Sequence, residues 1–170
     1  MPATRFTASS RGLLQWSSHK VRCALGRTGV TPAESKREGD GASPAGVWPM
    51  RQLYWRADRL ARPATGLPAI EIIPEAGWCD DPLDPFYNRP VILPYPTSHE
   101  KLWREDRVYD LIVELGYNDA PVVPGKGSAI FLHLAREDYS PTEGCIACAL
   151  PDLLALLRDA KPGDELEITA

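Results

Sequence analysis

Proline and glycine interrupt this chain along its whole length, with 17 prolines and 13 glycines scattered among 170 residues. Proline lacks a backbone donor and glycine costs backbone entropy, so neither suits the interior of a long helix. A chain of this size buries one sizeable core. The pattern therefore predicts a mainly β domain with many turns, in which residues 11–170 form a single domain and residues 1–10 a flexible, frayed terminus.

The charge of the chain and the distribution of its apolar residues argue against two classes of partner. The net charge is −4 and the basic residues are dispersed, whereas a nucleic-acid partner requires a basic stripe or patch. No segment approaches the roughly 20 apolar residues that span a bilayer, so no membrane partner is expected. Residues 1–26 lack the unbroken apolar run of about 7 to 15 residues found in export signals, which predicts a cytoplasmic protein.

Several regular elements are expected from local patterns. Alternation of apolar and polar residues predicts strands over 12–16, 21–26, 47–56, 108–115 and 165–169. A helix is predicted over 151–160, because Pro151 stands at its first turn and leucines follow at helical spacing. A second helix is predicted over 97–107, where Thr97 and Glu100 have the spacing of a capping box.

The stretch that points most directly to a chemical role runs from Gly127 to Leu157. An apolar, β-prone run ends at His133, and after a charged loop a second apolar run starts at Gly144 and Cys145. A thiol is mostly protonated near neutral pH, so an attacking cysteine needs a base that holds it as thiolate. His133 can serve if the loop folds back, and Gly144 lets a carbonyl substrate approach the backbone N–H groups around Cys145, where an oxyanion hole would form. We interpret Cys145 and His133 as a nucleophile and its base.

The remaining cysteines leave an alternative open. Cys145 and Cys148 form a C-x-x-C pair, which is typical of a redox site or of half a zinc site. A structural zinc site needs a second ligand pair at close spacing, and the sequence offers none. We therefore interpret Cys148 as a core residue, Cys23 and Cys79 as small buried apolar residues, and expect no metal and no cofactor. The competing hypothesis is a non-catalytic zinc- or peptide-binding β module.

The Gly127–Leu157 stretch resembles the active-site motif of the L,D-transpeptidase catalytic domain, the YkuD-type family. That motif is a strand ending in His, a loop, and Ser/Thr-x-Gly-Cys-Ile/Val, matched here by His133, Thr142, Gly144, Cys145 and Ile146. The positions that commonly hold Gly, His and Arg are occupied by Leu134, Glu143 and Ala147. A second family motif, Lys-x-x-Gly-Asp-x-x-Ser/Thr-Pro-x-Gly, is similar to an earlier loop and is matched by Lys36, Gly39, Asp40, Ser43, Pro44 and Gly46.

The resemblance implies a two-sheet β-sandwich-like fold with a few short helices and an acyl-transfer reaction on peptidoglycan. Cys145 would attack the L,D peptide bond between the diamino acid and the terminal D-Ala of a stem tetrapeptide. His133, oriented by the backbone carbonyl of Leu134, would act first as base and then as acid, and the N–H groups of Gly144 and Cys145 would hold the oxyanion.

Two outcomes of this reaction are expected to compete. A cytoplasmic enzyme meets soluble muropeptides rather than a wall polymer, which favours hydrolysis by an L,D-carboxypeptidase in muropeptide recycling. The alternative is an L,D-transpeptidase that cross-links two stem peptides. The resemblance also implies that a carbapenem would form a covalent adduct at Cys145.

Further residues are candidates for contact with the substrate. The insertion over residues 75–98 is too long and too aromatic for a disordered loop, and we expect it to form a wall over the active site. The alternative is that its aromatic side chains only pin the loop to the sheet. The candidate substrate-binding residues are Trp78, Asp80, Asp81, Tyr117, Asn118, Thr142 and Glu143.

Overall fold

The computed structural model describes residues 2–170, and this part of the chain is mainly β, with thirteen strands, one α-helix and one short 3-10 helix. In chain order the elements are β1 (Arg5–Ser9), β2 (Leu13–Trp16), β3 (His19–Ala24), β4 (Val30–Pro32), η1 (Ala33–Ser35), β5 (Ser43–Trp55), β6 (Ala69–Glu71), β7 (Ala76–Cys79), β8 (Pro90–Ile92), β9 (His99–Lys101), β10 (Leu111–Leu115), β11 (Phe131–Leu134), β12 (Ile146–Cys148), α1 (Leu150–Asp159) and β13 (Glu165–Thr169).

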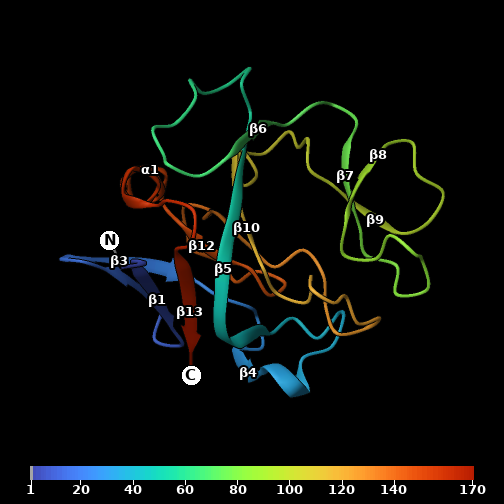
Figure 1. The fold of residues 1–170 in the computed structure, drawn as a ribbon, viewed down its shortest axis with the longest axis horizontal. Helices are drawn as coiled ribbons and strands as arrows, with labels where there is room; N and C mark the ends of the chain where they lie inside the picture. The colour runs from blue at the N-terminus through green and yellow to red at the C-terminus, as the bar shows by residue number, and fades with distance from the viewer. Residues whose placement is uncertain (1) are drawn as a thin grey trace.

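Strand β5 is the centre of the architecture and runs through the middle of the molecule in Figure 1. Its first half pairs with β13 and its second half with β10, both antiparallel. From β10 the sheet continues through β11, β12, β3, β2 and β1 to β13, so the ring of strands closes on β5. The expected mainly β fold is confirmed, but one barrel-like sheet is present in place of two separate packed sheets. The sheet closes because one half of the long strand β5 pairs with β13 and the other half with β10.

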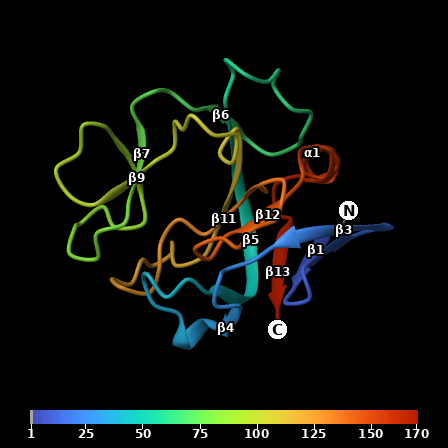
Figure 2. The same cartoon turned by 180° about the vertical axis from the view of Figure 1, so that it is seen from behind.

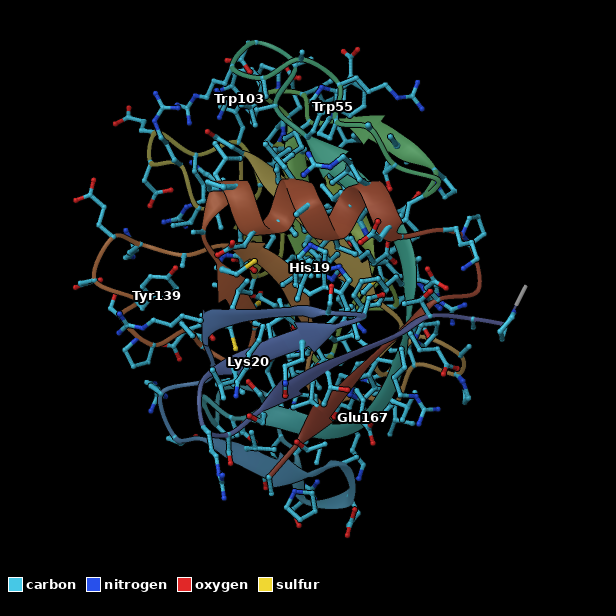
Figure 3. All side chains as sticks on the ribbon, turned by 90° about the vertical axis from the view of Figure 1, so that its left-hand side faces the viewer. His19, Lys20, Trp55, Trp103, Tyr139 and Glu167 are labelled. Carbon is cyan, nitrogen blue, oxygen red and sulfur yellow. The ribbon has the colours of Figure 1, made fainter. Side chains whose placement is uncertain are left out.

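Helix α1 confirms the helix predicted from Pro151 and packs against the main core. Leu153, Leu156 and Leu157 are fully buried there, and each contributes roughly 1.5 to 3 kcal/mol relative to an exposed side chain. Trp16 Nε1 donates a hydrogen bond to Asp159 (2.9 Å), and Figure 3 shows the helix beside the β2–β3 hairpin. Within residues 2–170, no helix is long and apolar enough to cross a membrane.

The first residues of the chain differ from the expected frayed terminus. Strand β1 pairs with β13 in parallel and with β2 in antiparallel fashion. Phe6 and Ala8 on this strand are fully buried. The partner β13 lies at the other end of the sequence, so the local polarity of residues 1–10 gives no sign of this pairing.

The long insertion carries a small sheet of its own. Strand β7 pairs with β8 on one side and with β9 on the other, and these strands form a lobe on the side of the molecule away from α1 (Figures 1 and 2). The helix predicted over 97–107 is wrong. Glu100 is instead the register partner of Trp78, and Thr97 Oγ1 donates to Asp84 (2.7 Å) rather than capping a helix.

The two faces of β11 belong to two different cores. Leu132 and Leu134 are buried in the main core, whereas Phe131 belongs to a smaller core that includes Trp78 and Tyr109. This division follows from the strand geometry, because successive side chains point to opposite faces. The β7–β9 lobe therefore packs against the face of β11 opposite the main core.

Candidate active site

Two adjacent parallel strands bring the predicted nucleophile and base to one face of the sheet. In the register of β11 and β12, His133 lies beside Ala147 and Leu132 beside Ile146. One position earlier on each chain segment, the Phe131 N–H contacts Cys145 Sγ. Because side chains alternate along a strand, His133 and Cys145 project to the same face as diagonal neighbours. Both residues line a single cavity of about 530 Å³.

The imidazole of His133 is held by its own strand. Nδ1 is 2.9 Å from the carbonyl oxygen of Leu134, and a carbonyl only accepts, so Nδ1 carries the proton and Nε2 is left as the acceptor. The ring of Tyr109 packs edge-on against the imidazole at 5.2 Å. Burial lowers the pKa of His133 to about 4, and the nearby charges of Arg104 and Arg136 act in the same direction.

The thiol of Cys145 is also in its neutral form. Its side chain is only 7% exposed. Sγ donates to the Ala129 carbonyl (3.2 Å) and accepts from the Phe131 N–H (3.4 Å). Burial raises the pKa of Cys145 to about 12, and the carboxylate of Glu100 adds to this effect.

The resting pair is therefore a thiol and a neutral imidazole, not the thiolate that the sequence suggests. Within residues 2–170, no hydrogen bond joins Cys145 to His133. If Cys145 acts as a nucleophile with His133 as its base, the proton must therefore move from Sγ to Nε2 after the thiol turns away from Ala129.

The turn before Cys145 is fixed by one hydroxyl group. Thr142 Oγ1 accepts from the Gly144 N–H (3.1 Å) and donates to the Cys145 carbonyl (2.6 Å). Gly144 has a φ of +135°, and a Cβ at this position would lie 2.8 Å from the carbonyl oxygen of Ala42. The turn therefore requires glycine. The Gly144 N–H is already engaged, which corrects the expectation of two oxyanion donors and leaves the Cys145 N–H as the available one.

The cavity wall carries both acidic and basic side chains. Among the acidic residues, Glu100 accepts from the hydroxyl of Tyr109, and burial raises its pKa, with Asp80 and Glu38 adding to the rise. Guanidinium groups lie near the imidazole. Arg104 and Arg136 both bond to Asp106, at 2.6 and 3.3 Å, and both line the cavity. They line the same cavity as Ala147, the position where the family motif commonly has arginine.

Three of the predicted substrate-binding residues line this cavity: Asp80, Thr142 and Glu143. Glu143 also forms an ion pair with Arg27 (3.0 Å). The other four, Trp78, Asp81, Tyr117 and Asn118, do not line it and serve the surrounding structure.

Each of those four makes its contacts elsewhere in the structure. Trp78 is buried, donates to Asn88 (2.9 Å) and packs on Phe131, so it pins the insertion to the sheet. The carboxylate of Asp81 accepts from a backbone N–H in its own loop. Tyr117 and Asn118 bond to backbone carbonyls of the loop that precedes β11.

For three residues that line the cavity, no local sequence pattern indicates a place in the site. Glu100 fits the pattern of a helix cap, and Arg104 lies in an ordinary charged run. Arg136 lies in the loop after β11, where a charged residue is unremarkable. They reach the cavity only because β9 pairs with β7 and because the segment before β10 folds over His133.

Cys148 does not share the site of Cys145. The two residues are three positions apart on an extended segment, so their side chains point to opposite faces. Cys148 is fully buried in the main core, where its register partner is Cys23. Among residues 2–170, no three His, Cys, Asp or Glu side chains are grouped in a way that would hold a metal ion.

The chain was compared with protein-family models, curated proteins and solved structures. The model of the L,D-transpeptidase catalytic domain family, YkuD, matches residues 4–168. Among solved structures, L,D-transpeptidase 1 from Mycobacterium tuberculosis is 15% identical, with a TM-score of 0.43, and the match covers 99% of this chain and 60% of that one. An L,D-transpeptidase from Mycobacterium smegmatis is 12% identical, with a TM-score of 0.43 and coverage of 98% and 58%.

A third similar structure is an L,D-transpeptidase in complex with imipenem, 14% identical, with a TM-score of 0.42 and coverage of 98% and 58%. The chain thus spans about three-fifths of the length of these solved structures. A search of curated proteins gave no match.

Proposed function

The chain belongs to the L,D-transpeptidase catalytic domain family, and from this we propose that it catalyses cysteine-dependent acyl transfer at the L,D peptide bond of peptidoglycan stem peptides. The bond lies between the diamino acid and the terminal D-Ala of a tetrapeptide. The observation that supports the proposal most strongly is that Cys145 and His133 lie on the same face of two paired strands and line one cavity. A nucleophile, its base and a backbone N–H are the parts that acyl transfer needs.

Acylation follows from these positions. Cys145 Sγ attacks the carbonyl carbon while its proton passes to His133 Nε2, the free acceptor of the ring. The carbonyl oxygen becomes an oxyanion and accepts from the Cys145 N–H. When the intermediate collapses, the C–N bond breaks, the imidazolium of His133 returns its proton to the amine of D-Ala, and the peptide stays on Sγ as a thioester.

The carboxylate of the departing D-Ala needs a cationic partner. Arg104 and Arg136 line the cavity near His133, which is where the leaving amine must lie to receive a proton. Ala147 fills little space at this point, so the guanidinium groups remain accessible from the cavity. We assign the recognition of the D-Ala carboxylate to these two arginines, because guanidinium groups bind carboxylates in a bidentate geometry.

The acceptor of the acyl group is proposed to be water, which makes the protein an L,D-carboxypeptidase. A cavity of about 530 Å³ is enough for one peptide end, and His133 can deprotonate a water molecule at the thioester. Release of the acid then restores the thiol. Action on soluble muropeptides in cytoplasmic recycling is part of this proposal, and cell fractionation tests it.

One observation favours transpeptidation as a second candidate. Asp80 and Glu100 line the cavity, and the carboxylate of Glu100 lies near enough to Cys145 to raise the pKa of the thiol. Carboxylates in the cavity would attract the ammonium group of an acceptor peptide. The acceptor amine would then replace water in the second step.

Product analysis decides between these candidates. The purified protein is incubated with a tetrapeptide ending in D-Ala, and the products are identified by mass spectrometry. Loss of one alanine supports hydrolysis, and a cross-linked dimer supports transpeptidation. An unchanged tetrapeptide, together with about one tightly held zinc per chain, would instead favour a non-catalytic zinc-binding module. A covalent adduct with a carbapenem would support acylation at Cys145.

A further inference from the structure

A buried hydroxyl lies directly behind the nucleophile. Ser43, the first residue of β5, is fully buried. Its Oγ accepts from the Gly26 N–H (3.0 Å) and donates to the Gly144 carbonyl (2.8 Å). One side chain therefore joins three segments that are distant in the sequence, and one of its partners is the residue just before Cys145.

The geometry of the peptide bond makes this contact relevant to catalysis. The Gly144 carbonyl and the Cys145 N–H belong to the same planar, trans peptide unit, so they point in opposite directions. Ser43 holds the carbonyl, and the Cys145 N–H must consequently point away from Ser43. Within residues 2–170, the Cys145 N–H has no hydrogen-bond acceptor, whereas the Gly144 N–H is bonded to Thr142.

We propose that Ser43 is a positioning residue for the oxyanion hole: by holding the Gly144 carbonyl it directs the Cys145 N–H towards the substrate oxygen. This role rests on the proposed acyl-transfer function. It concerns the transition state and not the thiol, because Ser43 contacts neither Sγ nor the cavity.

The surrounding loop is built to keep Ser43 in place. A Cβ on Gly26 would lie 2.4 Å from the carbonyl oxygen of Gly41, so the two backbones are in direct contact there. Lys36 is buried and bonds to Asp40 (2.6 Å), which in turn accepts from the Ala42 N–H (2.9 Å). These contacts fix the segment just before Ser43, and they give the loop over residues 36–46 a defined task beside the active site.

The test separates reactions of Cys145 that form an oxyanion from one that does not. Acylation by p-nitrophenyl acetate forms an oxyanion and is followed by release of nitrophenolate, whereas alkylation by iodoacetamide forms none and is followed by protein mass. Ser43→Ala should slow acylation by about 10- to 100-fold, because one oxyanion donor is worth up to about 1,000-fold. Alkylation should stay within about twofold of wild type. On the tetrapeptide, kcat should fall and KM should not change.

Three variants control for packing. Thr28→Ala removes a hydroxyl that bonds to the carbonyl of Asp40 (2.8 Å) and loosens the same loop without touching Gly144, so it should acylate like wild type. The threonine of Ser43→Thr and the valine of Ser43→Val have side chains of nearly the same shape, but only threonine carries a hydroxyl group. Threonine should retain most of the acylation rate and valine should lose it, with folding of each variant checked by circular dichroism.

The outcomes that would overturn the inference are distinct from failure of the proposed function. The positioning role would be rejected if Ser43→Ala were acylated at the wild-type rate, or if its rates of acylation and alkylation fell equally. So would failure of both hydroxyl-free variants to fold, since Ser43 would then act on stability alone. A wild-type protein whose nitrophenolate release does not exceed that of Cys145→Ala would instead contradict the proposed function itself.

Discussion

Acid should destabilise this protein through His133, and the structure gives the size of the effect. The ordinary pKa of the imidazole is 6.5, and burial in the cavity wall lowers it to about 4. Below pH 6.5 the unfolded chain binds a proton at His133 that the folded protein does not bind until about pH 4. The free energy of unfolding therefore decreases as the pH falls through this window. A difference of about 2.5 in pKa, at about 1.4 kcal/mol for each pKa unit, gives about 3 kcal/mol.

The assay is urea denaturation at several pH values between 7.5 and 4.5, compared with His133→Asn. The side-chain nitrogen of asparagine takes the place of Nδ1 and can donate to the Leu134 carbonyl, but it does not titrate. Subtracting the two curves cancels the contributions of the other ionisable groups. The wild-type advantage at pH 7.5 should shrink by between about 2 and 3 kcal/mol at pH 4.5.

A constant difference between the two proteins across this range would refute the reasoning, because it would mean that His133 has an ordinary pKa. A difference that grows as the pH falls would show that the folded protein prefers the imidazolium. That result would restore the thiolate–imidazolium pair suggested by the sequence.

Three further predictions concern the cavity. Gly144→Ala should abolish acylation and lower the free energy of unfolding in urea by roughly 1 to 3 kcal/mol, because the residue has a φ of +135° and the new Cβ would meet Ala42; an unchanged midpoint would contradict this. The acid limb of kcat/KM should lie near pH 4, the pKa of His133, with no rise towards pH 9, because burial raises the pKa of Cys145 to about 12; a rise there would indicate an ordinary thiol. Arg136→Gln should raise KM for the tetrapeptide about 5-fold, equal to about 1 kcal/mol, whereas Arg107→Gln, outside the cavity, should not.

Local sequence patterns predicted the features that depend on local chemistry. Pro151 and the leucines after it specify α1, since both the start of the helix and its buried face are set within ten residues. The contact between His133 Nδ1 and the next carbonyl was implied by the family resemblance, and it too depends on one strand end alone. Thr142, Gly144 and Cys145 lie within four consecutive residues, so their motif can be recognised from the sequence alone.

The features that failed depend on partners far away in the chain. The capping-box pattern at Thr97 and Glu100 is satisfied instead by Asp84 and Tyr109, and the segment pairs with β7 as a strand. Strand β1 exists because β13 offers it an edge from the other end of the chain. The neutral state of His133 follows from burial, which no single segment encodes.

The most direct test of the central claim is the mass of the intact protein during turnover. The wild-type protein is mixed with the tetrapeptide, quenched in acid within the first turnover, and digested to locate any adduct. We predict an added mass equal to the tetrapeptide residue without its terminal D-Ala, carried by Cys145 and absent from Cys145→Ala. Release of D-Ala by Cys145→Ala, or an adduct on any other residue, would contradict the account.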